Sequence, residues 1–413
     1  MHAHKKMLPR LWMMVLLLLA NLLLGAAPAA AAYAVEITVG NVFYDYGQQA
    51  TFQAQIEPAD AWREVNLFLQ PQGASARVEQ VEPDGDGGIV YIYDLAEKPL
   101  PAFTPVTFWF RVVDQDGNEY TSPEKTFVYD DNRFEWEQLE SERFEVHWYE
   151  RDIAFGQQVL NTAEQGLRRA QSYLPGTIDD RVRIFVYSSV EDFQQALQLS
   201  TSAWAVGHAS PALSTIVVSV PPGPEEVLEL ERQIPHELAH IFEYALAGDG
   251  YAQIPVWLLE GTASLAELYP NPDYQSVLDN AAQNTSLITM SQLCGPFPRE
   301  ASAAFLSYAQ SASFVRFLHQ KYGTSGLGEL MQIYADGVGC EEGPQSAWNV
   351  SLNELEYRWR QESLGMDMAG LIFGNLLPYI ILLALLVLLP LIFALSGGLR
   401  SARGKASREV HES

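Results

Sequence analysis

The chain has 413 residues, a formal net charge of −26, 48% hydrophobic residues and two cysteines. This length allows two or three domains, each with a substantial core. The strong negative charge argues against binding to nucleic acid or to an anionic lipid surface through overall charge, so we expect no nucleic-acid partner.

Residues 1–32 are typical of a secretory signal peptide. A basic start precedes an apolar run from Leu11 to Leu24, and the small residues of Pro28–Ala32 fit a cleavage site. No cysteine follows the apolar run, so lipoprotein anchoring is not supported. An uncleaved N-terminal anchor is the alternative. Either way, we expect an exported protein.

Residues 33–130 predict a domain built of strands. Short β-rich runs are separated by turn sequences such as Pro83–Gly88 and Asp114–Asn118. Seven short strands at this spacing predict a β-sandwich of immunoglobulin or fibronectin type. Asp130–Arg133 is the predicted linker to the next domain. The predicted strands are Val35–Val39, Thr51–Ile56, Glu64–Leu69, Arg77–Val81, Gly88–Leu95, Val106–Val113 and Lys125–Tyr129.

Residues 134–364 predict a second domain of α+β class, with a small mixed sheet followed by a mostly helical C-terminal lobe. Strand character appears at Phe134–Tyr149, Arg181–Tyr187 and Ser214–Val220. Apolar residues recur at helical spacing after Glu260, most clearly over Ala301–Tyr322.

The stretch His236-Glu237-Leu238-Ala239-His240 carries the clearest chemical signal in the chain. On a helix, residues i and i+4 lie on one face, so both imidazoles can point at a common metal ion. Glu237, one helical step round, can then reach a water on the metal without binding the metal. This is the H-E-x-x-H pattern, in which the glutamate acts as general base. The plainer alternative is two core or solvated histidines.

A third ligand is expected from Glu260, which lies 20 residues after His240 in the apolar run Trp257–Ala263. A turn at Gly248–Gly250 separates this run from the first helix. Two antiparallel helices can bring Glu260 to the metal and complete a site with two histidines and one glutamate. The alternative for Glu260 is a solvated carboxylate near the start of a helix.

HELAH followed by P-x-W-L-x-E-G-x-A resembles the gluzincin metallopeptidases, and most closely the peptidase-MA-like group of bacterial secreted or membrane proteins. The resemblance runs from about residue 134 to about residue 362. It implies a thermolysin-like zincin domain in which His236, His240 and Glu260 bind one catalytic Zn²⁺ ion. By the same resemblance, Glu237 is the catalytic base.

The family resemblance also implies that the edge strand of the sheet borders the cleft, where an extended peptide adds as a further strand. We expect Ser214–Val220 to be that edge, with Ile216, Val217 and Val218 as candidate substrate-binding residues. The alternative is an ordinary buried strand.

Pro235, directly before the first ligand, departs from the family pattern. Proline inside a helix removes a backbone hydrogen bond and clashes with the preceding turn. Either Glu225–Ile234 is a separate helical segment kinked into the next, or the helix that carries the ligands starts at Pro235.

Zinc peptidases use a tyrosine or histidine donor to stabilise the oxyanion that develops at the scissile carbonyl. Tyr308 lies where the family resemblance is good, so it is a candidate for this catalytic role. Tyr244 and His208 are weaker candidates. For each of the three, a packed core or surface position is the alternative.

Cys294 and Cys340 could pair in an oxidising compartment. Such a disulfide would stabilise the fold by about 3–4 kcal/mol. Two buried free thiols are the alternative, and neither cysteine is expected to bind the metal.

Residues Leu371–Leu395 contain no charged side chain and predict one transmembrane helix. The basic residues of the tail, 396–413, predict a cytoplasmic C-terminus. We therefore expect a single-pass protein of the cell membrane, with its folded domains outside and a membrane contact through this helix alone.

The predicted function is that of a membrane-anchored, exported zinc metallopeptidase acting on a peptide or protein substrate. Endopeptidase activity is favoured because no G-x-M-E-N segment is present to hold a free amino terminus. The alternative is a catalytically inactive exported receptor or scaffold that keeps the peptidase fold. An intramembrane protease is not supported, because HELAH lies outside the apolar segment.

Overall fold

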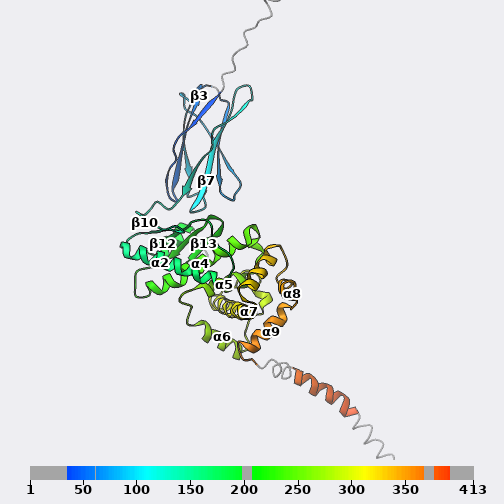
Figure 1. Ribbon diagram of the computed structural model, residues 1–413. Helices are drawn as coiled ribbons and strands as arrows, with labels where there is room; N and C mark the ends of the chain where they lie inside the picture. Colours follow the sequence, from blue (N-terminus) through cyan, green and yellow to red (C-terminus); the bar gives the residue numbers. More distant parts are fainter. Residues whose placement is uncertain (1–34, 61, 198–206, 367–375, 391–413) are drawn as a thin grey trace, which may run out of the picture. The chain divides into compact units, whose positions relative to one another are not determined.

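The computed structural model describes residues 35–60, 62–197, 207–366 and 376–390 (Figure 1). The chain divides into two compact units, residues 1–133 and residues 134–413. The predicted signal peptide at residues 1–32 and the predicted tail at residues 396–413 lie outside the described residues.

The first unit contains two antiparallel sheets. In one sheet, β3 pairs with β1, β2 and β6, and in the other, β7 pairs with β4, β8 and β9, while β5 pairs with β4. Every predicted strand is present, but β2 and β8 were missed because three residues are too few to show alternation. The strands are β1 (Glu36–Val39), β2 (Phe43–Asp45), β3 (Gln49–Glu57), β4 (Glu64–Pro71), β5 (Arg77–Val81), β6 (Gly88–Asp94), β7 (Thr104–Val113), β8 (Glu119–Thr121) and β9 (Lys125–Tyr129).

Side chains from the two sheets meet in a shared core. Along β3 and β7, alternate side chains are buried, as expected for strands with one face on a core. Phe52 of β3 packs edge-to-face on Phe108 of β7, with ring centroids 5.0 Å apart. This packing of one sheet on the other is the arrangement of a β-sandwich.

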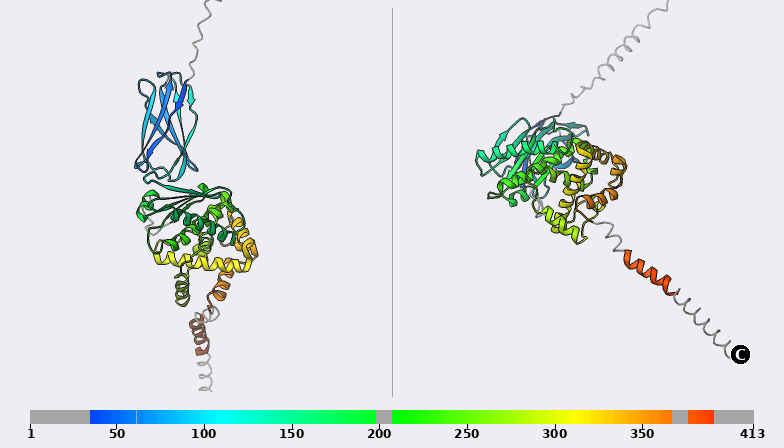
Figure 2. Two further views of the ribbon diagram at one scale, coloured as in Figure 1. Left: turned by 60° about the vertical axis from the view of Figure 1, so that its left-hand side comes forward. Right: turned by 60° about the horizontal axis from the view of Figure 1, so that its bottom comes forward.

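The second unit is built on a mixed sheet, whose strands are drawn in teal to green in Figure 2. Its strand order is β10-β11-β12-β14-β13. The central pairs are parallel and the two outer pairs are antiparallel. Among the described residues, β10 and β13 therefore form the edges. The strands are β10 (Glu137–Glu140), β11 (Phe144–Trp148), β12 (Val182–Tyr187), β13 (Gly207–Ser210) and β14 (Thr215–Ser219).

The prediction that Ser214–Val220 forms the sheet edge is wrong, so Ile216, Val217 and Val218 lose the edge position for which substrate binding was expected of them. Strand β14 lies between β12 and β13, and all its side chains are buried. The unbroken run Thr-Ile-Val-Val-Ser is what a strand covered on both faces requires.

Helices cover the sheet and form the rest of the second unit (Figure 1). Helix α2 connects the parallel strands β11 and β12 and packs on α4, while α5 packs on α7. Helix α7 is interrupted at Gly323, whose φ of 69° favours glycine. The helices are α2 (Ile153–Gln171), α3 (Val190–Leu197), α4 (Glu226–Ala247), α5 (Val256–Ala266), α6 (Tyr274–Gln283), α7 (Ala301–Ala335), α8 (Gly343–Trp348) and α9 (Leu352–Glu362), with short 3₁₀ turns at Pro211–Leu213, Gly248–Gln253 and Met290–Leu293.

The predicted transmembrane helix at Leu371–Leu395 is not supported. Within the described ranges, no helix is both long enough and apolar enough to cross a membrane. The transmembrane element of the predicted fold class and the single-pass localisation are therefore corrected, and the predicted membrane contact has no support.

Cys294 and Cys340 form a disulfide bond. Both cysteines contact the first turn of α5: the Val256 amide donates to the Cys294 carbonyl at 3.1 Å, and the Trp257 indole N–H lies 3.4 Å from the Cys340 sulfur. The bond thus ties two separate segments to the start of one helix.

Replacing both cysteines by serine should lower the free energy of unfolding of the second unit by roughly 4 kcal/mol, because the bond closes a loop of 46 residues. Urea denaturation monitored by tryptophan fluorescence measures this change. Reduced wild-type protein is the control and should match the double variant. An unchanged unfolding midpoint would show that the disulfide does not stabilise the unit.

Candidate metal centre

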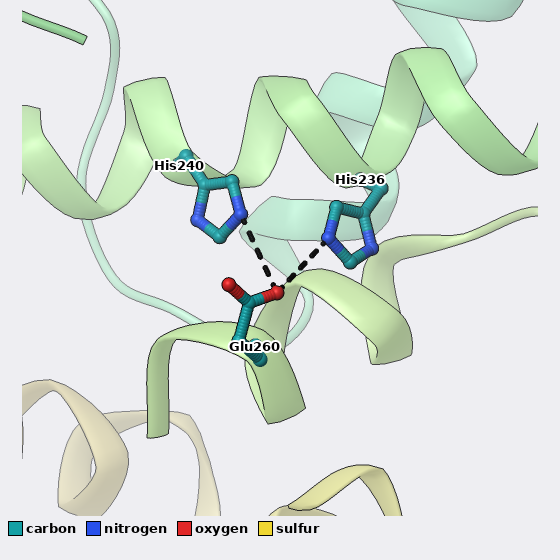
Figure 3. A group of neighbouring side chains, drawn as sticks. All are labelled: His236, His240 and Glu260. Carbon is teal, nitrogen blue, oxygen red and sulfur yellow. Dashed lines mark ion pairs between the residues drawn. The ribbon is translucent and has the colours of Figure 1, made fainter. Parts of the chain in front are cut away.

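Three side chains from two helices converge on one point (Figure 3). His236 and His240 lie one turn apart on α4, and Glu260 projects toward them from α5. The Oε2 atom of Glu260 is 3.3 Å from His236 Nε2 and 3.9 Å from His240 Nε2. One donor atom from each residue lies within 4.8 Å of the others, so all three can bind one ion.

The chemistry of this cluster fits zinc. Two imidazole nitrogens and one carboxylate oxygen make up a donor set common in catalytic zinc sites. Glu260 Oε2 is buried and, despite its closeness to His236, makes no properly aligned hydrogen bond within the described residues. A buried carboxylate oxygen without a donor, facing two imidazole nitrogens, is suited to a cation between them.

Two further carboxylates orient the imidazoles. Glu267 Oε1 lies 3.1 Å from His236 Nδ1, and Glu243 Oε2 lies 2.9 Å from His240 Nδ1. An ionised carboxylate only accepts hydrogen bonds, so each imidazole donates through Nδ1. This fixes the tautomer that leaves each Nε2 free to bind a metal.

The charges of the cluster shift its pKa values. Burial alone would lower the pKa of both histidines, but the neighbouring carboxylates raise that of His236 well above its usual value and that of His240 to about 8. Burial raises the pKa of Glu243 to about 7. Burial also acts to raise the pKa of Glu260, but the two histidines outweigh it and hold that pKa below the usual value. A metal ion must therefore displace protons from the histidines when it binds.

Pro235 lies inside a continuous α4, which begins at Glu226, so the helix does not start at the proline. Proline has no N–H, and the Glu231 carbonyl one turn earlier therefore lacks its helical donor. That carbonyl instead accepts hydrogen bonds from the amides of Leu268 at 2.9 Å and Tyr269 at 3.4 Å. The proline thus frees an acceptor that anchors the chain directly after Glu267.

Two glycines allow the helices around the site to approach closely. A Cβ atom on Gly166 of α2 would lie 3.0 Å from the Cα of Pro235. A Cβ on Gly261, next to Glu260, would lie 2.6 Å from the Ser311 carbonyl oxygen of α7. A larger residue at Gly166 would push α2 away from α4, and a larger residue at Gly261 would push α5 away from α7.

Glu237 lines a cavity of about 420 Å³ together with His236 and Tyr308. The backbone of edge strand β13 passes directly beside its carboxylate, because a Cβ on Gly207 would lie only 2.4 Å from Glu237 Oε1. The structure therefore brings the predicted base, a predicted metal ligand and a sheet edge to one cavity.

Of Tyr308, Tyr244 and His208, only Tyr308 is among the described residues that line this cavity. Tyr308 lines the cavity, its ring centroid is 6.4 Å from that of His236, and burial raises its pKa, which keeps the hydroxyl protonated. Tyr244 lines a different cavity, behind α4. His208 lies on β13, and it is not among the described residues that line the Glu237 cavity.

Comparison with known protein families identifies the second unit. A family model of the peptidase MA superfamily matches residues 162–364. This part of the chain belongs to the peptidase MA superfamily. The predicted gluzincin-like family is thus confirmed.

Solved structures add only partial similarity. The M1 zinc metallopeptidase from Deinococcus radiodurans is 11% identical, over 79% of this chain and 92% of its own, with a TM-score of 0.36. A β-1,3-glucan binding domain of carbohydrate-binding module family 56 is 12% identical, over 22% of this chain and 98% of its own, with a TM-score of 0.17. No curated protein matches the chain.

Sequence reasoning missed Glu243, Glu267 and Gly207. Glu243 lies three residues after His240 on the same helix, and this spacing could have indicated it. Glu267 has no local signal, because its contact with His236 depends on the packing of α5 against α4. Gly207 was missed because the short sequence of β13, Gly-His-Ala-Ser, lacks the alternation of a strand.

Each of the three single variants His236→Ala, His240→Ala and Glu260→Ala should contain less zinc after purification than the wild type, because the two remaining donors hold a catalytic zinc weakly. Zinc per chain, measured after dialysis, tests this. Glu354→Ala, an exposed carboxylate on α9, is the control and should keep the wild-type content. Full zinc occupancy in Glu260→Ala would exclude Glu260 as the third ligand.

Pro235→Ala should weaken zinc binding by roughly 10-fold, the lower end of the effect of disturbing a residue that orients a ligand. The restored N–H competes for the Glu231 carbonyl and releases the segment after Glu267. Alanine also favours the helix, so thermal stability should not fall in parallel. Zinc affinity from chelator competition and the melting temperature are measured on the same samples, and unchanged affinity would contradict this role.

Proposed function

We propose that this chain is a zinc-dependent metallopeptidase that hydrolyses internal peptide bonds of a peptide or protein substrate. The observation that carries the proposal is the position of Glu237. Its carboxylate lies beside the backbone of a sheet edge and lines the same cavity as His236, which is one of three residues that can bind a single metal ion. Membership of the peptidase MA superfamily supports the same activity.

Strand β13 supplies the surface for an extended peptide. Among the described residues it pairs only with β14, so its other side can offer backbone groups to a substrate strand. At Gly207 the absence of a side chain lets the peptide backbone approach Glu237. This edge, and not Ile216–Val218, is therefore the proposed binding strand.

A bound zinc ion would supply a Lewis acid that polarises the scissile carbonyl. The chain's own residues carry the proton transfers: Glu237 accepts a proton from the attacking water and passes it to the leaving amine. The hydroxyl of Tyr308, kept protonated by burial, donates a hydrogen bond to the carbonyl oxygen as it becomes negative.

The proposal includes endopeptidase action and export. The sequence has no G-x-M-E-N segment for a free amino terminus, which favours cleavage within chains. Export is supported by the signal-like sequence of residues 1–32 and by the disulfide, since disulfides persist in oxidising compartments.

Glu237→Gln should lower turnover by roughly 10²–10⁴-fold while zinc stays bound, because the amide cannot accept a proton and the three ligands are untouched. Cleavage of a diverse peptide library, read by mass spectrometry with and without a chelator, measures turnover. Zinc content is determined on the same samples.

Glu225→Gln, the same change at the exposed start of α4, is the matched control and should keep wild-type turnover. Equal cleavage by Glu237→Gln and wild type would remove Glu237 from the mechanism. A zinc-loaded wild type that cleaves nothing in the library would favour the receptor or scaffold instead.

A further inference from the structure

Strand β6 of the first unit forms an open edge of its sheet. Among the described residues it pairs only with β3, in an unbroken antiparallel register. Side chains alternate between the two faces of the strand, and those of Val90 and Ile92 point away from the core, with exposed fractions of 68% and 60%. This edge therefore presents apolar side chains to solvent.

The backbone groups of the same two residues face the open side of the strand. Antiparallel strands alternate between hydrogen-bonded and non-hydrogen-bonded pairs. The Leu95 amide donates to the Gln48 carbonyl at 2.9 Å, so the odd-numbered residues of β6 are the ones that bond to β3. The amides and carbonyls of Val90 and Ile92 point the other way, where no described strand meets them.

Three other edges in the described part of the chain carry features that block pairing with another chain. Charged side chains lie within β5, at Arg77 and Glu79, and β10 begins and ends with glutamate. Strand β1 has only four residues and starts at Glu36. Short or charged edge strands prevent edge-to-edge association. By contrast, β6 is seven residues long and contains no proline and no charged residue before Asp94.

We propose that β6 forms the contact of a homodimer, in which it pairs antiparallel with β6 of a second copy of this chain. In the register centred on Tyr91 all seven residues overlap, and each Val90 lies opposite Ile92 of the other copy. These two residues then exchange hydrogen bonds through their outward-facing amides and carbonyls. This contact lies in the first unit and does not rest on the proposed peptidase function.

The charges and symmetry of β6 favour a second copy of the chain over an unrelated strand. Self-pairing in this register places Asp94 opposite Gly88 of the other copy, so no like charges meet in the ladder. This matters because each chain carries a net charge of −26. Each copy contributes the same strand, so the contact is isologous and the assembly ends at two chains.

The outer face of the sheet adds an apolar contact to this backbone pairing. Phe43 of β2 is 60% exposed, and it lies opposite Thr51 of β3, which in turn lies opposite Ile92. In the dimer this row continues onto Val90 of the other copy. Cross-strand pairs of β-branched side chains stabilise a ladder. A single strand pair is nevertheless a small interface, so the dimer should be weak and concentration-dependent.

Sedimentation velocity of the purified full-length protein over a series of concentrations tests for the dimer. The wild type should shift from monomer to dimer as the concentration rises. Val90→Lys and Ile92→Lys should each raise the dissociation constant roughly 10-fold or more, because each change places two lysines in the ladder. Both positions are exposed, so the folded unit can accept lysine at either.

Val78→Lys is the matched control, because it makes the same change at a 53% exposed valine of the charged edge strand β5. This variant should dimerise like the wild type. A wild type that stays monomeric at every concentration would overturn the proposal. So would a dimer whose dissociation constant is the same in Val90→Lys as in the wild type.

Cysteine cross-linking tests the register. Directly opposite residues of a hydrogen-bonded pair have Cα atoms about 5.5 Å apart, which suits a disulfide, whereas diagonal neighbours lie about 7–8 Å apart. Under mild oxidation, a mixture of Val90→Cys and Ile92→Cys proteins should form a cross-linked dimer, and each variant alone much less. The native cysteines are already paired, so they do not compete. Equal or absent cross-linking in all three samples would contradict the proposed pairing.

Discussion

The site depends on a concentration of negative charge that the fold must compensate. Glu243 is fully buried, Glu267 is 3% exposed, and the Glu260 side chain is 21% exposed, and all three surround the two histidines. Burying carboxylates without partners is costly. Protonated histidines offset part of this charge, as their raised pKa values indicate. A divalent cation at the Nε2 atoms would offset more, so the packing around the site favours bound metal.

Helix α5 must hold Glu260 in place, and the fold fixes this helix at three points. The disulfide partners contact its first turn, Gly261 presses its middle against α7, and the Glu231 carbonyl binds the chain after its end. Each contact joins segments far apart in the sequence. The third ligand therefore depends on the whole helical lobe, whereas His236 and His240 are positioned by one helix alone.

This difference explains what the sequence could predict. The spacing of His236 and His240 and the alternation of the longer strands are local, and the structure reproduces them. The partners of His236 and of the Glu231 carbonyl come from tertiary packing, so no local sequence pattern marks Glu267. Pro235 indicates only the second contact, because a proline inside a helix leaves a carbonyl that another group must satisfy. The family resemblance, more than local spacing, indicated Glu260.

The error at the sheet edge has a related cause. Strand order is set by long-range pairing, and an apolar run such as that of β14 does not indicate its neighbours. The edge among the described strands, β13, is short and weakly apolar, which suits a strand that presents one side to solvent or ligand. Its residue beside the base is Gly207, which has no side chain with which to discriminate between substrates.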